Sequence, residues 1–419
     1  MAEDPATLVV GPSWIGDMVM AQCLLKALKR QEPGRPIDVA APVWVAPLLA
    51  RMPEVRCGIP LPFPHKRLDL GGRIALGRSL RGRYDRAYVL PGSFKSALLP
   101  YAAGIRRRTG YRGEVRYGLL NDVRRVPAGM RRRTAFLYQA LAGPGAPETP
   151  SLSVDAANQA ALCRRFGLVA GRFVALMPGA EFGATKRWPA EKYAGFAARV
   201  ASLDLPAAVI GSAADQPVGE EIVRLMPAAV NLCGKTQLED AIDLLAAARL
   251  AVSNDSGLMH VAAAVGTPLV AIYGSTSPDN TPPLSPRAEI VSLGLSCSPC
   301  HQKVCPLGHL DCLNKLDVAL VGAAAQPLGG GIGQDRAGGG EEAVRALRGV
   351  GLDAEEADAA EEAVAAQHRV IDGGVAAHVR RPVRVQHHPH VPLVPRSFQQ
   401  KGRMPIPCDS HRDLLRQRM

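Results

Sequence analysis

The sequence alternates short apolar segments with helical ones on both sides of residues 143–154, a segment rich in Pro, Gly and Ser. Before this segment, TLVVG at 7–11 predicts a buried strand, and a helix to about residue 28 and a second strand at 36–42 follow it. Strand, helix and strand in this order begin a parallel sheet. Because the alternation starts again after residue 154, the sequence predicts two α/β units.

The second unit has the clearer pattern. Its strands and helices alternate from FVALMPG at 173–179 to PLVAIYG at 268–274, which is typical of a doubly wound sheet. Aromatic residues are scarce, while Ala, Leu and Val dominate, and this composition favours helices packed on buried strands. We expect two doubly wound, Rossmann-like domains, residues 1–145 and 155–320, with a ligand site in the cleft between them.

The excess of positive charge lies in the first unit. Residues 1–160 contain 24 Lys and Arg against 12 Asp and Glu, whereas residues 161–419 contain 26 of each kind. Such a field attracts an anionic partner, whether a nucleic acid, a phosphorylated saccharide or an acidic membrane surface. The N-terminus has no basic segment followed by a long apolar run, and no stretch reaches ~18 uninterrupted apolar residues, so we expect a cytoplasmic protein without a membrane span.

Residues 321–419 have a different character from both units. PLGGGIGQDRAGGG at 327–340 is followed by alternating Ala and acidic residues and then by HVRRPVRVQHHPHVPLVPRS. We interpret this region as a low-complexity tail that is disordered or read out of frame; a natural low-complexity extension is the alternative.

The loop after the strand at 173–179 contains a candidate diphosphate site. Thr185 and Lys186 lie in it, and Pro189 stands where a helix would begin. A lysine and backbone N–H groups above the carboxyl end of a strand can hold a diphosphate. The alternative is a surface loop with solvated Lys and Arg side chains.

A second polar group follows the strand at 249–254. Asp255 and Ser256 lie where the strand gives way to a helix, Gly257 permits a close approach of backbone, and His260 lies one turn into the helix. The N–H groups of this turn can bind a phosphate oxygen. Ordinary N-caps and a buried helix histidine are the alternative. Because two loops offer anion contacts from one sheet edge, the binding interpretation is favoured.

The segment GPSWIGDMVMAQ at 11–22 places a carboxylate, Asp17, after the first strand. It is neither a G-x-G-x-x-G motif nor a P-loop, and a phosphate would be repelled by Asp17. If this corner faces a nucleotide held by the second unit, Asp17 is a candidate base for an acceptor hydroxyl. From these residues alone, a carboxylate that caps the helix is the simpler interpretation.

The last cluster is SCSPCHQKVCPLGHLDC, in which four cysteines lie near two histidines. Cysteines at this density can bind zinc or an iron–sulfur cluster, although the spacing matches no standard zinc finger. A loop of reduced thiols is the alternative. The residues concerned are Cys297, Cys300, Cys305 and Cys312.

Five segments, in order between residues 7 and 316, together resemble the bacterial ADP-heptose glycosyltransferases of lipopolysaccharide synthesis: GPSWIGDMVMAQ, PGAEFGATKRWP, SNDSGLMHVAAA, YGSTSPDNTPPLSP and CSPCHQKVCPLGH. The resemblance implies a GT-B fold and an inverting transfer of L-glycero-D-manno-heptose from ADP-heptose. It also implies an acceptor, the first heptose of the inner core carried on lipid A and Kdo, and a reaction that needs no cofactor.

The resemblance also implies roles for single residues. Asp17 matches the general base, which reverses the simpler interpretation above, and Lys186 matches the lysine that neutralises the diphosphate leaving group. Asp255 matches an acid that contacts heptose hydroxyls. The remaining donor-binding candidates are Thr185, Ser256 and Gly257 for the phosphates, His260 beside them, Asp215 for the ribose and Thr236 for the adenine.

The basic first unit would then face an acceptor with acidic sugars and lipid A phosphates. We expect peripheral contact with the inner face of the inner membrane. The acceptor-side candidates are Lys95, Arg106, Arg107 and Arg108, with solvated surface arginine as the alternative.

Two rival functions remain at this point. Another GT-B enzyme, such as a nucleotide-sugar epimerase, would bind a similar donor without a glycan acceptor. A basic nucleic-acid-binding protein would fit the charge, but the chain lacks aromatic stacking motifs, so we expect no nucleic-acid partner.

Overall fold

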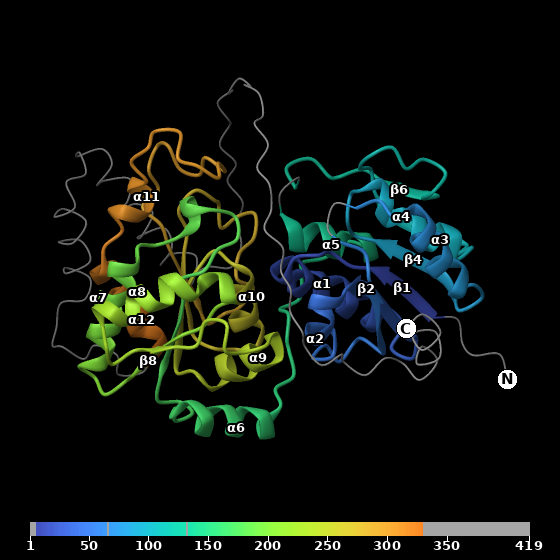
Figure 1. Cartoon of the computed structure of the whole chain (residues 1–419). Helices are drawn as coiled ribbons and strands as arrows, with labels where there is room; N and C mark the ends of the chain where they lie inside the picture. Colours follow the sequence, from blue (N-terminus) through green and yellow to red (C-terminus); the bar gives the residue numbers. More distant parts are fainter. Residues whose placement is uncertain (1–5, 65–66, 131–132, 330–419) are drawn as a thin grey trace.

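The computed structural model describes residues 6–64, 67–130 and 133–329, which form two six-stranded sheets (Figure 1). All strand pairs in both sheets are parallel. Parallel sheets need helical crossovers that cover their faces, so the predicted α/β class is confirmed.

The first sheet has the strand order β3-β2-β1-β4-β5-β6. The order reverses between β1 and β4, and ligand sites of such sheets lie at this point, outside the carboxyl ends of the strands. The strands are β1 (Ala6–Val10), β2 (Ile37–Pro42), β3 (Cys57–Leu61), β4 (Tyr84–Val89), β5 (Arg107–Tyr111) and β6 (Asp122–Arg124). The helices are α1 (Ile15–Gln31), α2 (Ala46–Leu49), α3 (Leu70–Ser79), α4 (Phe94–Ala102) and α5 (Thr134–Ala142), with a 3-10 turn η1 (Val43–Val45).

The second sheet repeats this plan, with the order β12-β11-β10-β7-β8-β9 and the reversal between β10 and β7. Its strands are β7 (Val174–Met177), β8 (Ala207–Val209), β9 (Val230–Asn231), β10 (Leu250–Asn254), β11 (Leu269–Ile272) and β12 (Ala288–Val291). The helices are α6 (Ala156–Phe166), α7 (Ala190–Ala201), α8 (Gln216–Leu225), α9 (Leu238–Ala247), α10 (Gly257–Ala264), α11 (Asp311–Asn314) and α12 (Val318–Gly329), with 3-10 turns η2 (Ala184–Lys186) and η3 (Ala213–Asp215).

Helix α12 continues past residue 320, where a tail was expected to begin. Val321 and Ala325 are buried on it, in the apolar cluster that also contains Trp188 and Phe196. The helix forms there because VALVGAAA presents small apolar residues to α7 and β12. The rest of the expected tail lies outside the described residues.

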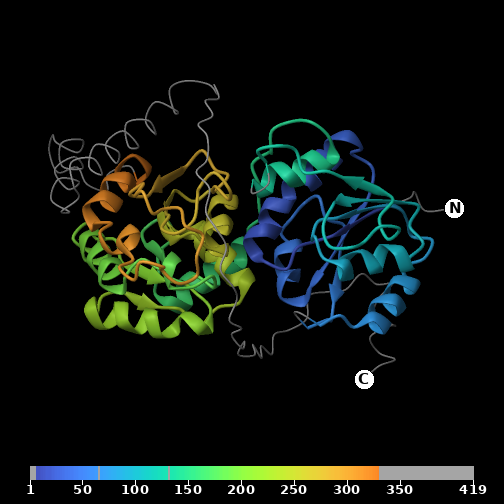
Figure 2. The ribbon, with the colours of Figure 1, turned by 90° about the horizontal axis from the view of Figure 1, so that it is seen from above.

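No helix in the described ranges is both long and apolar enough to cross a bilayer. The longest, α1, has 17 residues and is buried around most of its circumference, because it packs against α5 and against α10 of the other half. Figures 1 and 2 show α1 in dark blue and α10 in yellow on the facing sides of the two halves. The two sheets therefore meet through the helices that follow β1 and β10.

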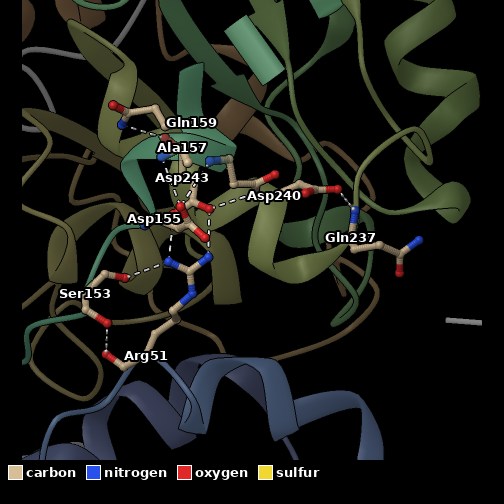
Figure 3. Close-up of polar contacts among 9 residues, drawn as sticks. Arg51, Ser153, Asp155, Ala157, Gln159, Gln237, Asp240 and Asp243 are labelled. Carbon is tan, nitrogen blue, oxygen red and sulfur yellow. Dashed lines mark hydrogen bonds and ion pairs between the residues drawn. The ribbon is translucent and has the colours of Figure 1, made fainter. Parts of the chain in front are cut away.

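A partly buried ion pair joins the two halves at the end of the linker (Figure 3). Arg51, just after α2, donates through Nη1 and Nη2 of its guanidinium to the two carboxylate oxygens of Asp243 on α9, at 3.0 and 2.7 Å. Asp243 is fully buried and also accepts hydrogen bonds from the Asp155 backbone N–H and the Asn158 side chain. One carboxylate thus fastens the first half, the linker and the second half together.

We predict that Arg51→Ala lowers the free energy of unfolding by about 3 kcal/mol, because it leaves the buried Asp243 carboxylate without its cation. Chemical denaturation measures this loss. The double variant Arg51→Met/Asp243→Leu, which removes both charges, should be less destabilised than Arg51→Ala. Equal free energies of unfolding for Arg51→Ala and the wild type would show that this ion pair does not stabilise the protein.

Candidate active site

The first turns of α1 and α10 lie in direct contact where the two halves meet. A Cβ atom on Gly16 would lie 2.7 Å from Cδ2 of His260, and one on Gly257 would lie 3.1 Å from Cβ of Ile15. Only glycine permits this approach without a shift of the neighbours. Asp17, which follows Gly16, is thereby held opposite the second sheet.

Lys186, Asp255 and Thr276 form one polar group at the carboxyl edge of the second sheet. Lys186, at the end of η2, donates to Asp255 Oδ2 at 2.6 Å, and Thr276 Oγ1 donates to the same oxygen at 2.5 Å. Asp255 directly follows β10, and Thr276 lies in the loop after β11, so two neighbouring strands supply them. The predicted proximity of the Lys186 loop and the Asp255 turn is present in the structure.

Asp17 lies in the field of this group. The pKa of Asp17 is raised to about 6, and burial is the largest cause. The charge of Lys186 lowers this pKa, and the charge of Asp255 raises it. The N-cap alternative for Asp17 is wrong, since Trp14 holds that position and Asp17 lies in the first turn. A carboxylate with this pKa is mostly ionised at neutral pH and is a stronger base than an ordinary aspartate.

His260 lies on the buried side of α10 beside the same charges. Burial lowers the pKa of His260 to about 4; the Asp255 carboxylate opposes that shift and Lys186 adds to it. The imidazole is therefore neutral at pH 7 and can both donate and accept a hydrogen bond. A neutral His260 can hydrogen-bond to a ligand beside Lys186, Asp255 and Thr276 without adding a charge to the site.

The other donor-side candidates lie along the same sheet edge. Thr185 is buried and donates to the Gln302 carbonyl oxygen at 2.6 Å, so its hydroxyl is already engaged. Ser256 caps α10 through the Met259 N–H. Asp215 accepts from Ser212 N–H and Oγ, and its carboxylate closely faces Gly179, just after β7. Thr236 precedes α9, in the loop after β9.

The acceptor-side candidates separate into two groups. Lys95 is in the first turn of α4, after the carboxyl end of β4, and so lies on the same edge of the first sheet as Asp17. Arg106, Arg107 and Arg108 are at the amino end of β5, because Arg107 pairs with Arg86 near the start of β4. Arg107 is bound to Asp122, and Arg108 donates to the Leu119 carbonyl oxygen. The structure does not bring these three arginines to Asp17.

The cysteine cluster packs beside the Lys186 loop. Within the described ranges, no three His, Cys, Asp or Glu side chains are grouped so that they could hold a metal ion. The thiols of Cys297, Cys300, Cys305 and Cys312 are unpaired.

Thr276 and Tyr138 were not among the site residues predicted from the sequence. Thr276 lies in the quoted YGSTSPD segment directly after an expected strand, so the rule that found Asp255 could have found it. Tyr138, on α5, is partly buried, and its pKa is raised well above the usual value, first by desolvation and then by the charge of Asp17. No local pattern marks a tyrosine that feels the charge of Asp17 from a helix more than a hundred residues later.

Comparisons with known proteins agree with this geometry. Residues 73–311 match glycosyltransferase family 9 (heptosyltransferase). The chain is 48% identical to lipopolysaccharide heptosyltransferase 2 of Escherichia coli K12 over 68% of this chain and 87% of that one. It is 47% identical to lipooligosaccharide heptosyltransferase 2 of Haemophilus influenzae, over 68% and 88%. The solved structure of E. coli ADP-heptose lps heptosyltransferase II aligns with a TM-score of 0.65 and 44% identity, covering 74% of this chain and 98% of that one.

Proposed function

The chain belongs to glycosyltransferase family 9, the heptosyltransferases, and from this we infer that it transfers heptose from ADP-heptose to the inner core of lipopolysaccharide. The observation that carries the inference is the 48% identity, which extends over 87% of a lipopolysaccharide heptosyltransferase 2. Two Rossmann-like domains of the GT-B type provide the two sides of the cleft, one for each substrate.

We propose that Lys186 binds the diphosphate of the donor. An ammonium has three donors, so Lys186 can keep its contact with Asp255 and still reach a phosphate oxygen. As the bond between the anomeric carbon and the phosphate oxygen breaks, negative charge grows on the departing ADP. A fixed cation therefore stabilises the transition state more than the bound donor.

Asp17 would act on the other substrate. The acceptor hydroxyl oxygen forms the new bond to the anomeric carbon, its proton passes to the Asp17 carboxylate, and ADP leaves with the electron pair of the broken bond. Because Asp17 lies on the half opposite Lys186, attack and departure occur on opposite faces of the sugar, which inverts the anomeric centre. Asp255, held by Lys186 and Thr276, and neutral His260 are positioned for the heptose hydroxyls.

The proposed base sets the pH dependence. Asp17 must be ionised to accept a proton, and its pKa of about 6 predicts that kcat/KM for the acceptor falls as the pH drops through about 6. His260, with a pKa of about 4, stays neutral over this interval. A pH–rate profile at saturating donor measures the acid limb; a rate that stays constant down to pH near 4 would contradict the assignment.

The direct test of function is release of ADP from ADP-heptose in the presence and absence of a truncated core acceptor that ends in the first heptose. We expect ADP to be released only when the acceptor is present, and we expect the product to be the acceptor enlarged by one heptose. Acceptor-independent turnover of the nucleotide sugar would favour an epimerase-like activity instead.

We also propose that the first domain contacts the cytoplasmic face of the inner membrane, where a lipid A-linked acceptor lies. The support is its charge, 24 basic against 12 acidic residues over positions 1–160. Co-sedimentation with vesicles that contain anionic lipid should decrease as salt rises. Binding that is equally strong to neutral vesicles would contradict an electrostatic contact.

A further inference from the structure

Lys303, in the cysteine-rich segment, shares an aromatic ring with the proposed diphosphate lysine. The Lys186 ammonium lies 5.1 Å from the centre of the Phe182 ring, and the Lys303 ammonium lies 5.7 Å from it. Lys186 is neutralised by Asp255, but no carboxylate in the described ranges forms a salt bridge with Lys303. Two cations around one ring repel each other unless an anion lies between them.

The backbone around Lys303 is fixed to the Lys186 loop. Thr185 Oγ1 donates to the carbonyl oxygen of Gln302, the residue before Lys303. Gly183 has φ +146, and a Cβ atom there would lie 2.7 Å from the Lys303 carbonyl oxygen, so this contact requires glycine. The position of Lys303 beside Lys186 is therefore built into the fold of both loops.

The same segment is fastened to the loop that holds Asp255. The His301 backbone N–H donates to the Ser275 carbonyl oxygen at 2.7 Å, and Ser298 Oγ donates to the Gly274 carbonyl oxygen at 2.6 Å. Thr276, which contacts Asp255, is the next residue in that loop. The cysteine-rich segment thus connects the loops after β7 and β11 and presents Lys303 at their edge.

We infer that Lys303 is a second cation for the diphosphate of the nucleotide sugar and that the cysteine-rich segment serves to place it. The inference rests on the proposed function, since it needs a diphosphate donor beside Lys186. Lys303 is exposed, so it would meet the donor from the open side of the cleft, while Lys186 holds it from within. Lys303 would neutralise part of the charge that grows on ADP as it departs.

The test is ADP and adenosine binding to the full chain by calorimetry, with Lys303→Ala, Lys303→Arg and a control. Loss of one charge-assisted contact should weaken ADP binding by about tenfold in Lys303→Ala and leave adenosine binding unchanged, because adenosine has no phosphate. Lys303→Arg should retain most of the affinity. The control is Lys315→Ala, which removes the same charge from a lysine paired with Asp311 at 3.1 Å, and it should bind ADP like the wild type.

Two results would overturn the inference: unchanged ADP affinity in Lys303→Ala, or an equal loss of ADP and adenosine affinity, which indicates a structural role. Neither of these results contradicts the proposed function, provided that the wild type binds ADP and transfers heptose. A wild type that neither binds ADP nor transfers heptose would instead refute the proposed function itself.

Discussion

Asp17→Asn should lower the rate of heptose transfer by about 10²–10⁴-fold and leave ADP binding nearly intact, because a neutral amide cannot accept the acceptor's proton. Asp17 belongs to the first domain, whereas the proposed donor contacts at Lys186 and Asp255 belong to the second. Single-turnover transfer assays and ADP titrations measure the two effects separately.

The same substitution should stabilise the protein. Because the folded-state pKa of Asp17 is raised from 3.8 to about 6, the folded state binds the proton more tightly, and ionisation at neutral pH costs stability. That cost is absent below about pH 4, builds up as the pH rises from there to about 6, and is nearly constant above it. Removing the charge should gain on the order of 1–2 kcal/mol at pH 7 and little at pH 4.

Asp204→Asn is the matched control for Asp17→Asn. Asp204 is exposed, far along the chain after α7, and its backbone φ of 57 is one that Asn adopts readily. The control should change neither transfer nor thermal stability. Near-normal transfer by Asp17→Asn, with the control unchanged, would show that Asp17 is not the base.

Lys186→Ala should impair both donor binding and the chemical step. We expect kcat to fall by about 10²–10³-fold, the loss seen when a fixed stabiliser of transition-state charge is removed. ADP affinity should fall as well, because the diphosphate loses a charge-assisted contact. Steady-state kinetics and ADP titration measure these losses.

Stability must be followed in the same variant, since Lys186→Ala also leaves the buried Asp255 carboxylate with the Thr276 hydroxyl and without its cation. Lys192→Ala serves as the control: Lys192 lies six residues further along the chain, and its ammonium donates to the Leu316 carbonyl oxygen and not to Asp255. A Lys186→Ala enzyme that is folded and transfers heptose as fast as Lys192→Ala would contradict the role of Lys186.

Much of the fold follows from local sequence patterns. The apolar strands at 7–10 and 250–254 are each followed, within four residues, by a helix with an apolar stripe, so periodicity places β1, α1, β10 and α10. Short edge strands such as β6 and β12 were not anticipated. They are three or four residues long and half-exposed, so their pairing depends on the neighbouring strand and leaves little local signal.

Some of the site residues could likewise be predicted from local sequence patterns, and others could not. Lys186 and Asp255 could be predicted because each follows a strand, and strands that share a sheet bring their carboxyl ends together. The arginines at 106–108 were assigned to the acceptor from charge alone, and charge does not say at which end of a strand a residue lies. Lys303 was overlooked because its relation to Lys186 depends on the packing of two loops more than a hundred residues apart.

The most direct test of the account is a crystal structure of Asp17→Asn with ADP-heptose and the truncated core acceptor bound. We expect the diphosphate to lie against Lys186, and the acceptor hydroxyl to lie between the residue 17 side chain and the anomeric carbon, on the face opposite the phosphate. An acceptor hydroxyl bound on the same face as the diphosphate, or out of hydrogen-bond reach of residue 17, would contradict it.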